Sequence, residues 1–212
     1  ITLAAADDPD KIEGAATVII AGDCCIAKEI TAREVENDTV LRAYVDADAP
    51  AGGNGLSWET ALNSIQDGID LVEEGGTVLV AEGLYAERIQ FNGKNIVVSS
   101  ADGADPRNTV IDAGGSGSVA VFSGSETGNA VLNGFTLTGG YNMASSGGRQ
   151  GAGVEGRNTR ATISNCIVAG NQAAGGGGIA RCYGTIIHCL IVNNSAKYGC
   201  GLFECANGII VN

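Results

Sequence analysis

The sequence predicts an all-β fold, a right-handed parallel β-helix (solenoid) with coils of about 23 residues. The segment ATISNCIVAGNQA, which begins at Ala161, recurs 23 residues later as GTIIHCLIVNNSA, which begins at Gly184. Glycine turns recur with a similar period, as GAGV at Gly151, GGGI at Gly176 and GCGL at Gly199. Short runs with alternating apolar residues lie between these turns. Repeated short strands without a crossover helix are typical of stacked coils.

The coils are expected to run from Thr77 to Asn212. The upstream runs are less uniform but follow the same pattern of strand, turn and strand: GTVLVAEGLY, NIVVSS, NTVIDAGG, VAVFSG and AVLNGFTLTGG. A single coil cannot bury its inward aliphatic face, so each coil packs on the next and the strands pair in parallel. Glycine is needed where the chain bends sharply between faces, because a positive φ is costly for residues with a Cβ.

One amphipathic helix is expected before the first coil, in an N-terminal capping region that spans residues 43–76. Its apolar face follows the helical period of roughly 3.6 residues. The residues on this face are Trp58, Ala61, Leu62, Ile65, Ile69 and Val72. Ser57 is its expected N-cap, and Gly75 and Gly76 are expected to end it. An open β-helix end is a row of unpaired strand groups, so we expect this helix to cover it.

The stretch YVDADAP begins at Tyr44, and GLSWETALNSIQDGIDLVEEGGTVLVAEGLY ends at Tyr85; both precede coils that contain NCI and GGGI. With these coils, residues 43–212 resemble right-handed parallel β-helix proteins of the pectate-lyase-like superfamily. The resemblance implies the fold but no single activity, because that superfamily contains polysaccharide lyases, glycosidases, adhesins and large bacterial surface proteins. It is strongest to the secreted and surface β-helix repeat proteins of bacteria.

Residues 1–42 lie outside this resemblance and are expected to form a strand-like N-terminal arm. The arm region includes the strand-like segments ATVIIAG and NDTVLRAYV. At the other end, the chain is expected to stop at Asn212, partway through a coil and without a capping segment. Terminal repeats normally differ from internal ones, so we expect either a longer protein or an open edge that another copy covers. The second alternative predicts a homo-oligomer formed through the open end and the arm.

The charge balance argues against nucleic acid as a partner. Twelve Lys and Arg residues stand against 24 Asp and Glu residues, and the formal net charge of −12 repels phosphate backbones. No apolar run approaches the roughly 18 residues that cross a bilayer, so no membrane span is expected. The segment LAAADD near Ile1 resembles the end of an export signal, which predicts an extracellular or cell-surface location.

Seven cysteines without metal-type spacing favour disulfides or buried thiols over a zinc site. Two pairs occupy equivalent positions one coil apart, namely Cys166 with Cys189 and Cys182 with Cys205. Adjacent coils lie about 4.8 Å apart, which a disulfide tolerates, so each pair is a candidate disulfide or thiol stack. A thiol stack is the favoured interpretation for the first pair. The remaining cysteines are Cys200, a candidate partner of Cys182 or Cys205, and Cys24 and Cys25, candidates for a bond to another chain.

The loop VDADAPAGGNG is a candidate calcium site. It places the oxygen-bearing side chains of Asp46, Asp48 and Asn54 close together in sequence. The loop lacks the spaced bidentate Glu of an EF-hand, so a solvated acidic loop is the competing interpretation. No other cofactor is expected.

One mixed cluster of charges is the candidate saccharide contact. Its residues are Lys94, Asp102, Asp105, Arg107 and Asp112. A lyase or glycosidase needs an acid cluster with a base, or two carboxylates that flank the sugar. The regular coils offer neither, so a polar surface loop is the competing interpretation and no catalytic residue is assigned. His188 is expected to align with Asn165 and Val211 as a stacked strand residue. Asn171 and Asn194 are expected to stack in an amide ladder.

These features predict a secreted or cell-surface structural β-solenoid that assembles end to end into a filament or surface layer. Two alternatives remain open: a carbohydrate-active enzyme similar to polysaccharide lyases, and a carbohydrate-binding or adhesive module. Both alternatives imply polysaccharide as the partner. A cleft lined by paired acids would favour the enzyme, whereas an uncovered last coil favours the structural role.

Overall fold

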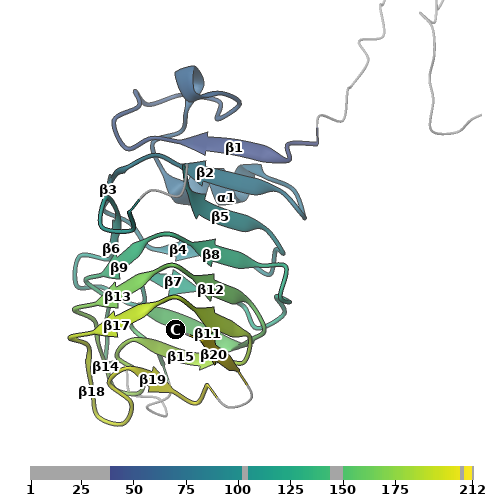
Figure 1. The fold of residues 1–212 in the computed structure, drawn as a ribbon. Coiled ribbons are helices and arrows are strands. Elements are labelled where there is room, and N and C mark those ends of the chain that lie inside the picture. Colours follow the sequence, from purple (N-terminus) through teal and green to yellow (C-terminus); the bar gives the residue numbers. More distant parts are fainter. Residues whose placement is uncertain (1–38, 102–104, 144–149, 206–207, 212) are drawn as a thin grey trace, which may run out of the picture. The chain divides into compact units, whose positions relative to one another are not determined.

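The computed structural model describes residues 39–101, 105–143, 150–205 and 208–211 (Figure 1). In these ranges the chain consists of short strands, the helix α1 (Ile65–Leu71) and the 3-10 helix η1 (Trp58–Thr60). Every pairing between its strands is parallel, which confirms an all-β parallel fold. Most of the predicted arm, with Cys24 and Cys25, lies outside the described residues, as does Asp102.

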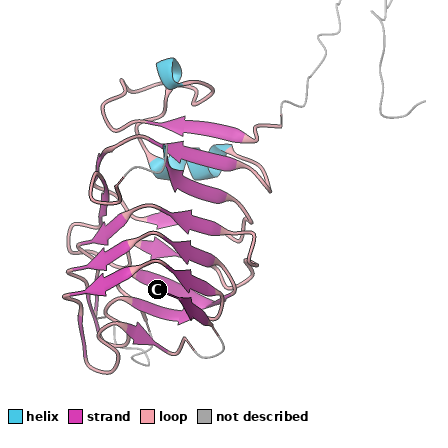
Figure 2. Cartoon of the chain, in the orientation of Figure 1, coloured by secondary structure: helices cyan, strands magenta, loops and turns pink. Residues whose placement is uncertain are grey.

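Four parallel sheets make up this part of the chain (Figure 2). Sheet A contains, in spatial order, β1 (Arg42–Val45), β2 (Thr77–Val80), β5 (Val97–Ser100), β8 (Val131–Asn133), β12 (Thr162–Ser164), β16 (Thr185–Ile187) and β20 (Ile209–Val211). Sheet B contains β3 (Gly83–Tyr85), β6 (Thr109–Asp112), β9 (Thr136–Thr138), β13 (Ile167–Ala169) and β17 (Leu190–Val192). Sheet C contains β4 (Ile89–Gln90), β7 (Ala120–Val121), β11 (Val154–Thr159), β15 (Ile179–Cys182) and β19 (Leu202–Phe203). Sheet D contains β10 (Tyr141–Asn142), β14 (Gln172–Ala173) and β18 (Ser195–Ala196).

The chain visits these sheets in a fixed cyclic order. From β2 in sheet A it passes to β3 in sheet B and β4 in sheet C, and it returns to sheet A at β5, beside β2. From β8 onward each circuit also includes a strand of sheet D, between sheets B and C. We call each circuit a coil. Stacked parallel sheets with this connectivity are compatible with the predicted β-helix.

Only the later coils keep the predicted length. In sheet A, Thr162 pairs with Thr185 one coil on, 23 residues later, and Thr185 pairs with Ile209, 24 residues later. The preceding step, from Val131 to Thr162, is 31 residues long. The register also corrects the expected alignment of His188, because Val211 pairs with Ile187 instead. One residue more lies between β19 and β20 than between β15 and β16, which shifts the last strand by one position.

Aliphatic side chains from successive coils form columns inside the stack. In sheet A the register aligns Ala43, Val78, Val98, Leu132, Ile163, Ile186 and Ile210. All members of this column are buried except Ile210, which belongs to the last coil. Burial of one Val, Leu or Ile side chain contributes about 1.5–3 kcal/mol, so each internal coil is stabilised by both of its neighbours.

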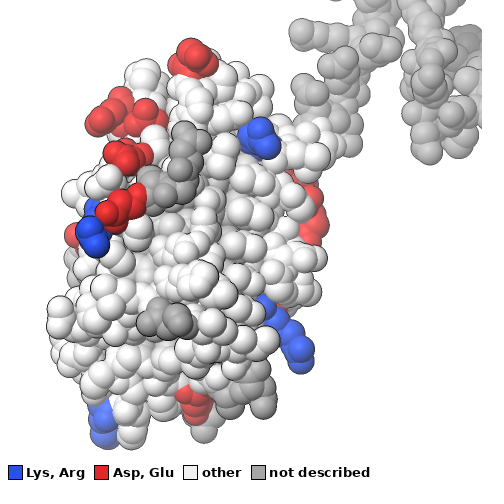
Figure 3. All heavy atoms as spheres, viewed as in Figure 1, with Lys and Arg blue, Asp and Glu red and all other residues white. Residues whose placement is uncertain are grey.

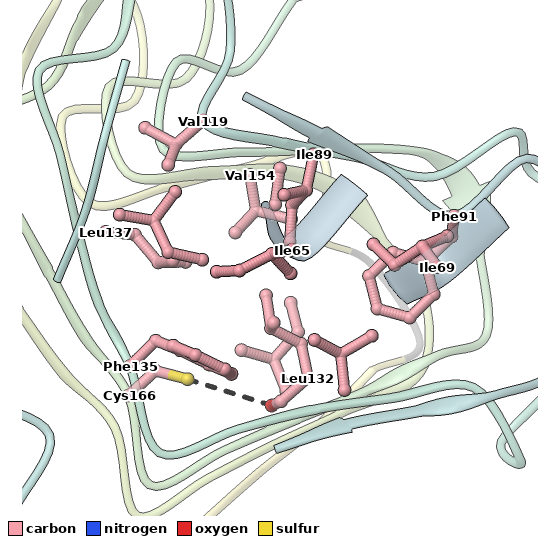
Figure 4. Packing of buried hydrophobic residues seen from close by; sticks show 14 of the residues in the cluster. Ile65, Ile69, Ile89, Phe91, Val119, Leu132, Phe135, Leu137, Val154 and Cys166 are labelled. Atoms are coloured by element: carbon pink, nitrogen blue, oxygen red, sulfur yellow. Dashed lines mark hydrogen bonds between the residues drawn. The ribbon is translucent and has the colours of Figure 1, made fainter. Parts of the chain in front are cut away.

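The helix α1 packs against this core and is held at both ends by charged side chains. Ile65 and Ile69 are fully buried and lie in the same cluster as the inward residues of the coils (Figure 4). At the N-terminus, the carboxylate of Glu87 accepts hydrogen bonds from the backbone N–H groups of Ile65, at 2.8 Å, and Gln66, at 3.0 Å. At the C-terminus, Lys94 Nζ donates to three backbone carbonyls, including that of Ile69 at 2.8 Å. Both contacts complement the helix dipole.

The helix begins later than the sequence predicted, so the expected N-cap at Ser57 is wrong. Ser64 is the N-cap, and its Oγ accepts a hydrogen bond from a backbone N–H of the first turn. The predicted continuous helix is interrupted because Leu62 bridges to Val45 of β1. The Leu62 N–H donates to the carbonyl of Tyr44 at 2.9 Å, so this N–H is engaged with a strand instead of a helical turn. The expected end is also wrong, because Val72 already has an extended backbone before the two glycines.

The parallel sheet begins before Thr77, because β1 pairs in register with β2. The other edge of β1 is covered by the segment that contains η1. Tyr44 donates its N–H to the carbonyl of Gly55 and accepts from Leu62, and Asp46 donates to the carbonyl of Leu62 at 2.8 Å. This segment therefore satisfies the backbone groups of the edge strand, which is the role that the sequence assigned to the helix.

None of the described helices combines the length and the apolar character needed to cross a membrane.

Candidate functional site

The last described coil is the least covered part of the stack. Each of the four sheets ends there, at β17, β18, β19 and β20, and we call these strands with their turns the terminal coil. Four aliphatic side chains of this coil are exposed: Leu190, Ile209, Ile210 and Val211. Ile210 is 54% exposed, although it continues the column whose other members are buried. Its exposure follows from its place at the end of the stack, because its counterparts have a coil on both sides.

The two ends of sheet A therefore differ. At the first end, backbone groups of β1 are paired with the segment that includes Gly55 and Leu62. At the other end, β20 pairs with β16 on one side, and no strand of the described residues pairs with its second side. An edge strand with exposed aliphatic side chains favours pairing with another strand.

Charge is distributed unevenly between these ends. On the face shown in Figure 3, acidic side chains gather over the N-terminal coils, whereas most of the surface over the later coils carries no charge. In the terminal coil, the charged side chains are Lys197 and Glu204. Two terminal coils that face each other would thus bring few like charges together.

The candidate calcium residues use their oxygens within local turns. Asp46 Oδ1 accepts a hydrogen bond from the backbone N–H of Asp48 at 3.0 Å. Asn54 Oδ1 accepts from the backbone N–H of Leu56 at 3.1 Å and from the hydroxyl of Thr60 at 2.7 Å. Among the residues that the structure describes, no three His, Cys, Asp or Glu side chains are grouped to hold a metal ion. The calcium site stays a prediction, because these contacts are those of structural turns.

The candidate saccharide residues are not brought together as one cluster. Lys94 caps α1, as described above, and Asp112 Oδ1 accepts a hydrogen bond from the backbone N–H of Gly114 at 2.8 Å. Asp105 and Arg107 form an exposed ion pair at 3.0 Å. These two residues are the part of the predicted cluster that borders a pocket.

This pocket is an open depression of about 310 Å³ beside sheet B. Its lining comprises Asp105, Pro106, Arg107, Asn165, Cys166, Ile167, His188 and Leu190. Asn165 and His188 occupy equivalent turns, and both have a φ of +52°. The sequence placed His188 in a stacked strand and missed its proximity to the ion pair. The aligned segments around Asn165 and His188 were the available signal, but they did not reveal which loop lies beside them.

Two asparagines form the predicted amide ladder. Asn171 Nδ2 donates to Asn194 Oδ1 at 3.0 Å, and Asn194 Nδ2 donates to the carbonyl of Val168 at 2.8 Å. Asn171 Oδ1 also accepts from the backbone N–H of Gly140 at 2.8 Å. The ladder links the turns of three successive coils, which indicates a structural role for these amides.

The sequence analysis missed a buried ion pair in sheet C. The Glu155 side chain is 3% exposed, and its Oε1 accepts hydrogen bonds from Arg181 Nη2 at 2.6 Å and Nε at 3.1 Å. The same carboxylate accepts from the backbone N–H groups of Gly151, at 2.6 Å, and Arg157, at 3.1 Å. One carboxylate therefore satisfies backbone and guanidinium donors from two coils.

Glu126 is a second buried carboxylate with a structural role. It accepts hydrogen bonds from the backbone N–H groups of Gly93, Ser123 and Gly124 at 2.7–3.0 Å. Burial raises the pKa of Glu126, but hydrogen bonds from backbone N–H groups outweigh it and hold the pKa below its ordinary value. Its charged form thus fixes the loop between β7 and β8. Buried acids that bind backbone N–H groups in this way have no donor or acceptor left over for a substrate.

The five described cysteines are free thiols, and their environments differ. Cys166 and Cys182 are buried, Cys189 and Cys205 are partly buried, and Cys200 is exposed. Burial raises the pKa of the Cys182 thiol to about 12 and also raises the pKa of Cys205. Cys200 Sγ lies 3.6 Å from the carbonyl of Ala196, within its own turn.

No protein-family model matches this chain, and no curated protein or solved structure matches it significantly. The resemblance to the pectate-lyase-like superfamily accordingly rests on the sequence segments around Tyr44, Tyr85 and the repeated coils. What is established for the described residues is a fold of stacked parallel β-sheets.

Proposed function

We propose that this protein is a secreted or cell-surface structural β-solenoid. In this proposal residues 43–212 form a right-handed parallel β-helix of the pectate-lyase-like type, with α1 as part of its N-terminal cap, and the terminal coil binds a second copy of the chain. The observation that carries it is the exposure of Ile210 at the end of a column that is otherwise buried.

A second copy is the occupant that the terminal coil fits best. Its own terminal coil offers the same exposed aliphatic side chains and the same free strand edge, so one patch can pair with itself about a two-fold axis. The few charges of the terminal coil oppose this contact only weakly. Burial of Ile209, Ile210 and Val211 from both copies would remove apolar area from water and favour association.

A contact of one patch with itself closes after two copies, so a filament or surface layer needs a second contact. Residues 1–42 are our candidate for it, and β1 itself is already covered at its outer edge by the segment around Leu62. Removal of residues 1–38 should then limit assembly to pairs, as measured by electron microscopy and light scattering. Fibres from the shortened chain would contradict this role.

The substitution Ile210→Lys tests the proposal directly. It places a charge among the aliphatic side chains of the terminal coil, and we expect self-association of the full chain to weaken at least about tenfold. Sedimentation velocity over a concentration series measures this. The matched control is Leu84→Lys, because Leu84 is 63% exposed but lies in β3, away from the terminal coil.

Circular dichroism should show that both variants keep the wild-type fold. Equal association of the wild type and Ile210→Lys would overturn the proposal. So would a wild-type chain that stays monomeric up to about 100 µM, a limit that corresponds to negligible affinity for an assembling protein.

The pocket near Arg107 favours a second function, carbohydrate binding without chemistry. A guanidinium beside a polar turn and an aliphatic floor formed by Ile167 and Leu190 suits an acidic polysaccharide. We expect Arg107→Ala to reduce binding of oligogalacturonate about tenfold in calorimetry, whereas Arg160→Ala, at another exposed position, should not. Equal binding by both variants would exclude the pocket. Cleavage of the oligomer would instead favour a polysaccharide lyase.

A further inference from the structure

Cys166 and Cys189 are the same residue of two consecutive coils. The register pairs Ser164 with Ile187 before them and Ile167 with Leu190 after them, so the two cysteines occupy equivalent positions. Strands in one sheet lie about 4.8 Å apart, and a disulfide tolerates Cα separations of roughly 4.4–6.8 Å. The backbone of the two coils therefore already meets the spacing that a disulfide needs.

The two thiols also share their orientation. Cys166 Sγ lies 3.1 Å from the carbonyl of Ser164, and Cys189 Sγ lies 3.3 Å from the carbonyl of Ile187, the residue two positions earlier in each case. Each sulfur also faces a carbonyl of the preceding coil, at 3.7 Å and 3.5 Å respectively. Both side chains thus point along the stack on the same side of the chain, one above the other.

The chemistry of the pair is asymmetric. A hydrogen bond from the Cys166 thiol lowers the pKa of Cys189 to about 7, and Cys189 is only partly buried. Burial raises the pKa of Cys166 well above its ordinary value. Cys189 is accordingly the thiol that ionises and meets solvent, whereas Cys166 stays protonated in the core until a partner sulfur is beside it.

We propose that Cys166 and Cys189 form a thiol–disulfide pair that joins the terminal coil covalently to the coil before it. The oxidant is a low-molecular-weight disulfide of the glutathione type. The Cys189 thiolate attacks one of its sulfurs, a mixed disulfide forms, and one thiol leaves. Cys166 then loses its proton and attacks the Cys189 sulfur, which releases the second thiol. The protein loses two electrons and two protons, and the oxidant disulfide is reduced to two thiols.

The second pair of equivalent cysteines is less suited to the same reaction. Burial raises the pKa of both Cys182 and Cys205, so neither thiol ionises readily near neutral pH. Their sulfurs face backbone carbonyls at 3.5–3.8 Å, and neither is hydrogen-bonded to the other thiol. Cys182 therefore provides a matched control for the reactive pair.

The bond would act on the most exposed part of the fold. Terminal coils have a neighbour on one side only and open more easily than internal ones. A link between residues 166 and 189 closes a loop in the unfolded chain and resists this opening. It does not depend on self-association, so its test and that of the Ile210 contact can fail separately.

The experiment treats the reduced full-length chain with oxidised glutathione, blocks the remaining thiols with an alkylating agent, and maps tryptic peptides by mass spectrometry. Cleavage after Arg160 and Arg181 gives one peptide that contains Cys166 alone, but the next contains both Cys182 and Cys189. In Cys182→Ser, a link between these peptides must join Cys166 to Cys189. We expect this link, with a melting temperature raised by roughly 5–10 °C in the oxidised form.

Cys166→Ser should instead retain glutathione as a stable mixed disulfide on Cys189, because no second thiol displaces it. The rate of the first step should be half-maximal near the pKa of about 7. The proposal is overturned if Cys182→Ser keeps both thiols alkylatable, if it stops at the mixed disulfide, or if Cys166 is linked to another cysteine.

Discussion

Replacement of Glu155 by glutamine is expected to lower the free energy of unfolding by about 3–5 kcal/mol. The carboxylate is buried and accepts hydrogen bonds from Arg181 and from the backbone N–H groups of Gly151 and Arg157. A glutamine side chain offers one oxygen for these donors and turns an NH₂ group toward the rest. The Arg181 guanidinium, which is largely buried, would also lose its counter-charge.

Urea unfolding followed by circular dichroism measures this loss, and the m-value shows whether the transition stays cooperative. The control is Asp105→Asn, which removes the charge from the exposed pair with Arg107. Exposed ion pairs contribute little, so we expect a change within about 1 kcal/mol. A Glu155→Gln chain as stable as the control would show that the buried pair is not needed to hold sheet C together.

Replacement of Phe122 by alanine is expected to cost about 3–5 kcal/mol. Phe122 stacks on Phe91 of the preceding coil, with ring centroids 4.3 Å apart and an angle of 28° between the planes. Both rings are fully buried, so truncation loses their mutual contact and leaves a cavity between coils. Because each coil contacts only its neighbours, the cavity cannot be filled from elsewhere in the stack.

Leu84→Ala is the matched control for Phe122, because Leu84 is a large apolar residue of the outer face. We expect its truncation to change the free energy of unfolding by no more than about 0.5 kcal/mol. Thermal unfolding and urea unfolding should rank the variants in the same order. A small loss for Phe122→Ala, comparable with that for Leu84→Ala, would mean that the two aromatic rings do not form a common core.

The repeated segments predicted the later strands well and the early part of the chain less well. β12 and β16 pair with the register that the repeat implies, because apolar alternation decides which face of a strand is buried. The helix was predicted too long, because Trp58, Ala61 and Leu62 fit a helical period although Leu62 pairs with a strand. Periodicity over a few residues cannot distinguish these states, and the tertiary contact decided between them.

The candidate sites show the same division. Asp105 and Arg107 were singled out from their charges, and the structure places them beside His188, which the sequence had assigned to a strand. Lys94 was grouped with them by proximity in sequence, yet it binds the end of α1. Glu155 was passed over, because nothing in its neighbourhood reveals an arginine 26 residues away.

The sequence by itself determined the composition of the coils, the alternation of their strands and the equivalence of Cys166 and Cys189, because these are properties of local pattern and of a constant repeat. Tertiary structure decided the register of the irregular coils, the ion pair of Glu155 with Arg181 and the exposure of Ile210. The physical reason is that burial and pairing depend on which coil lies above and below a residue, and coils of unequal length do not reveal this in the sequence.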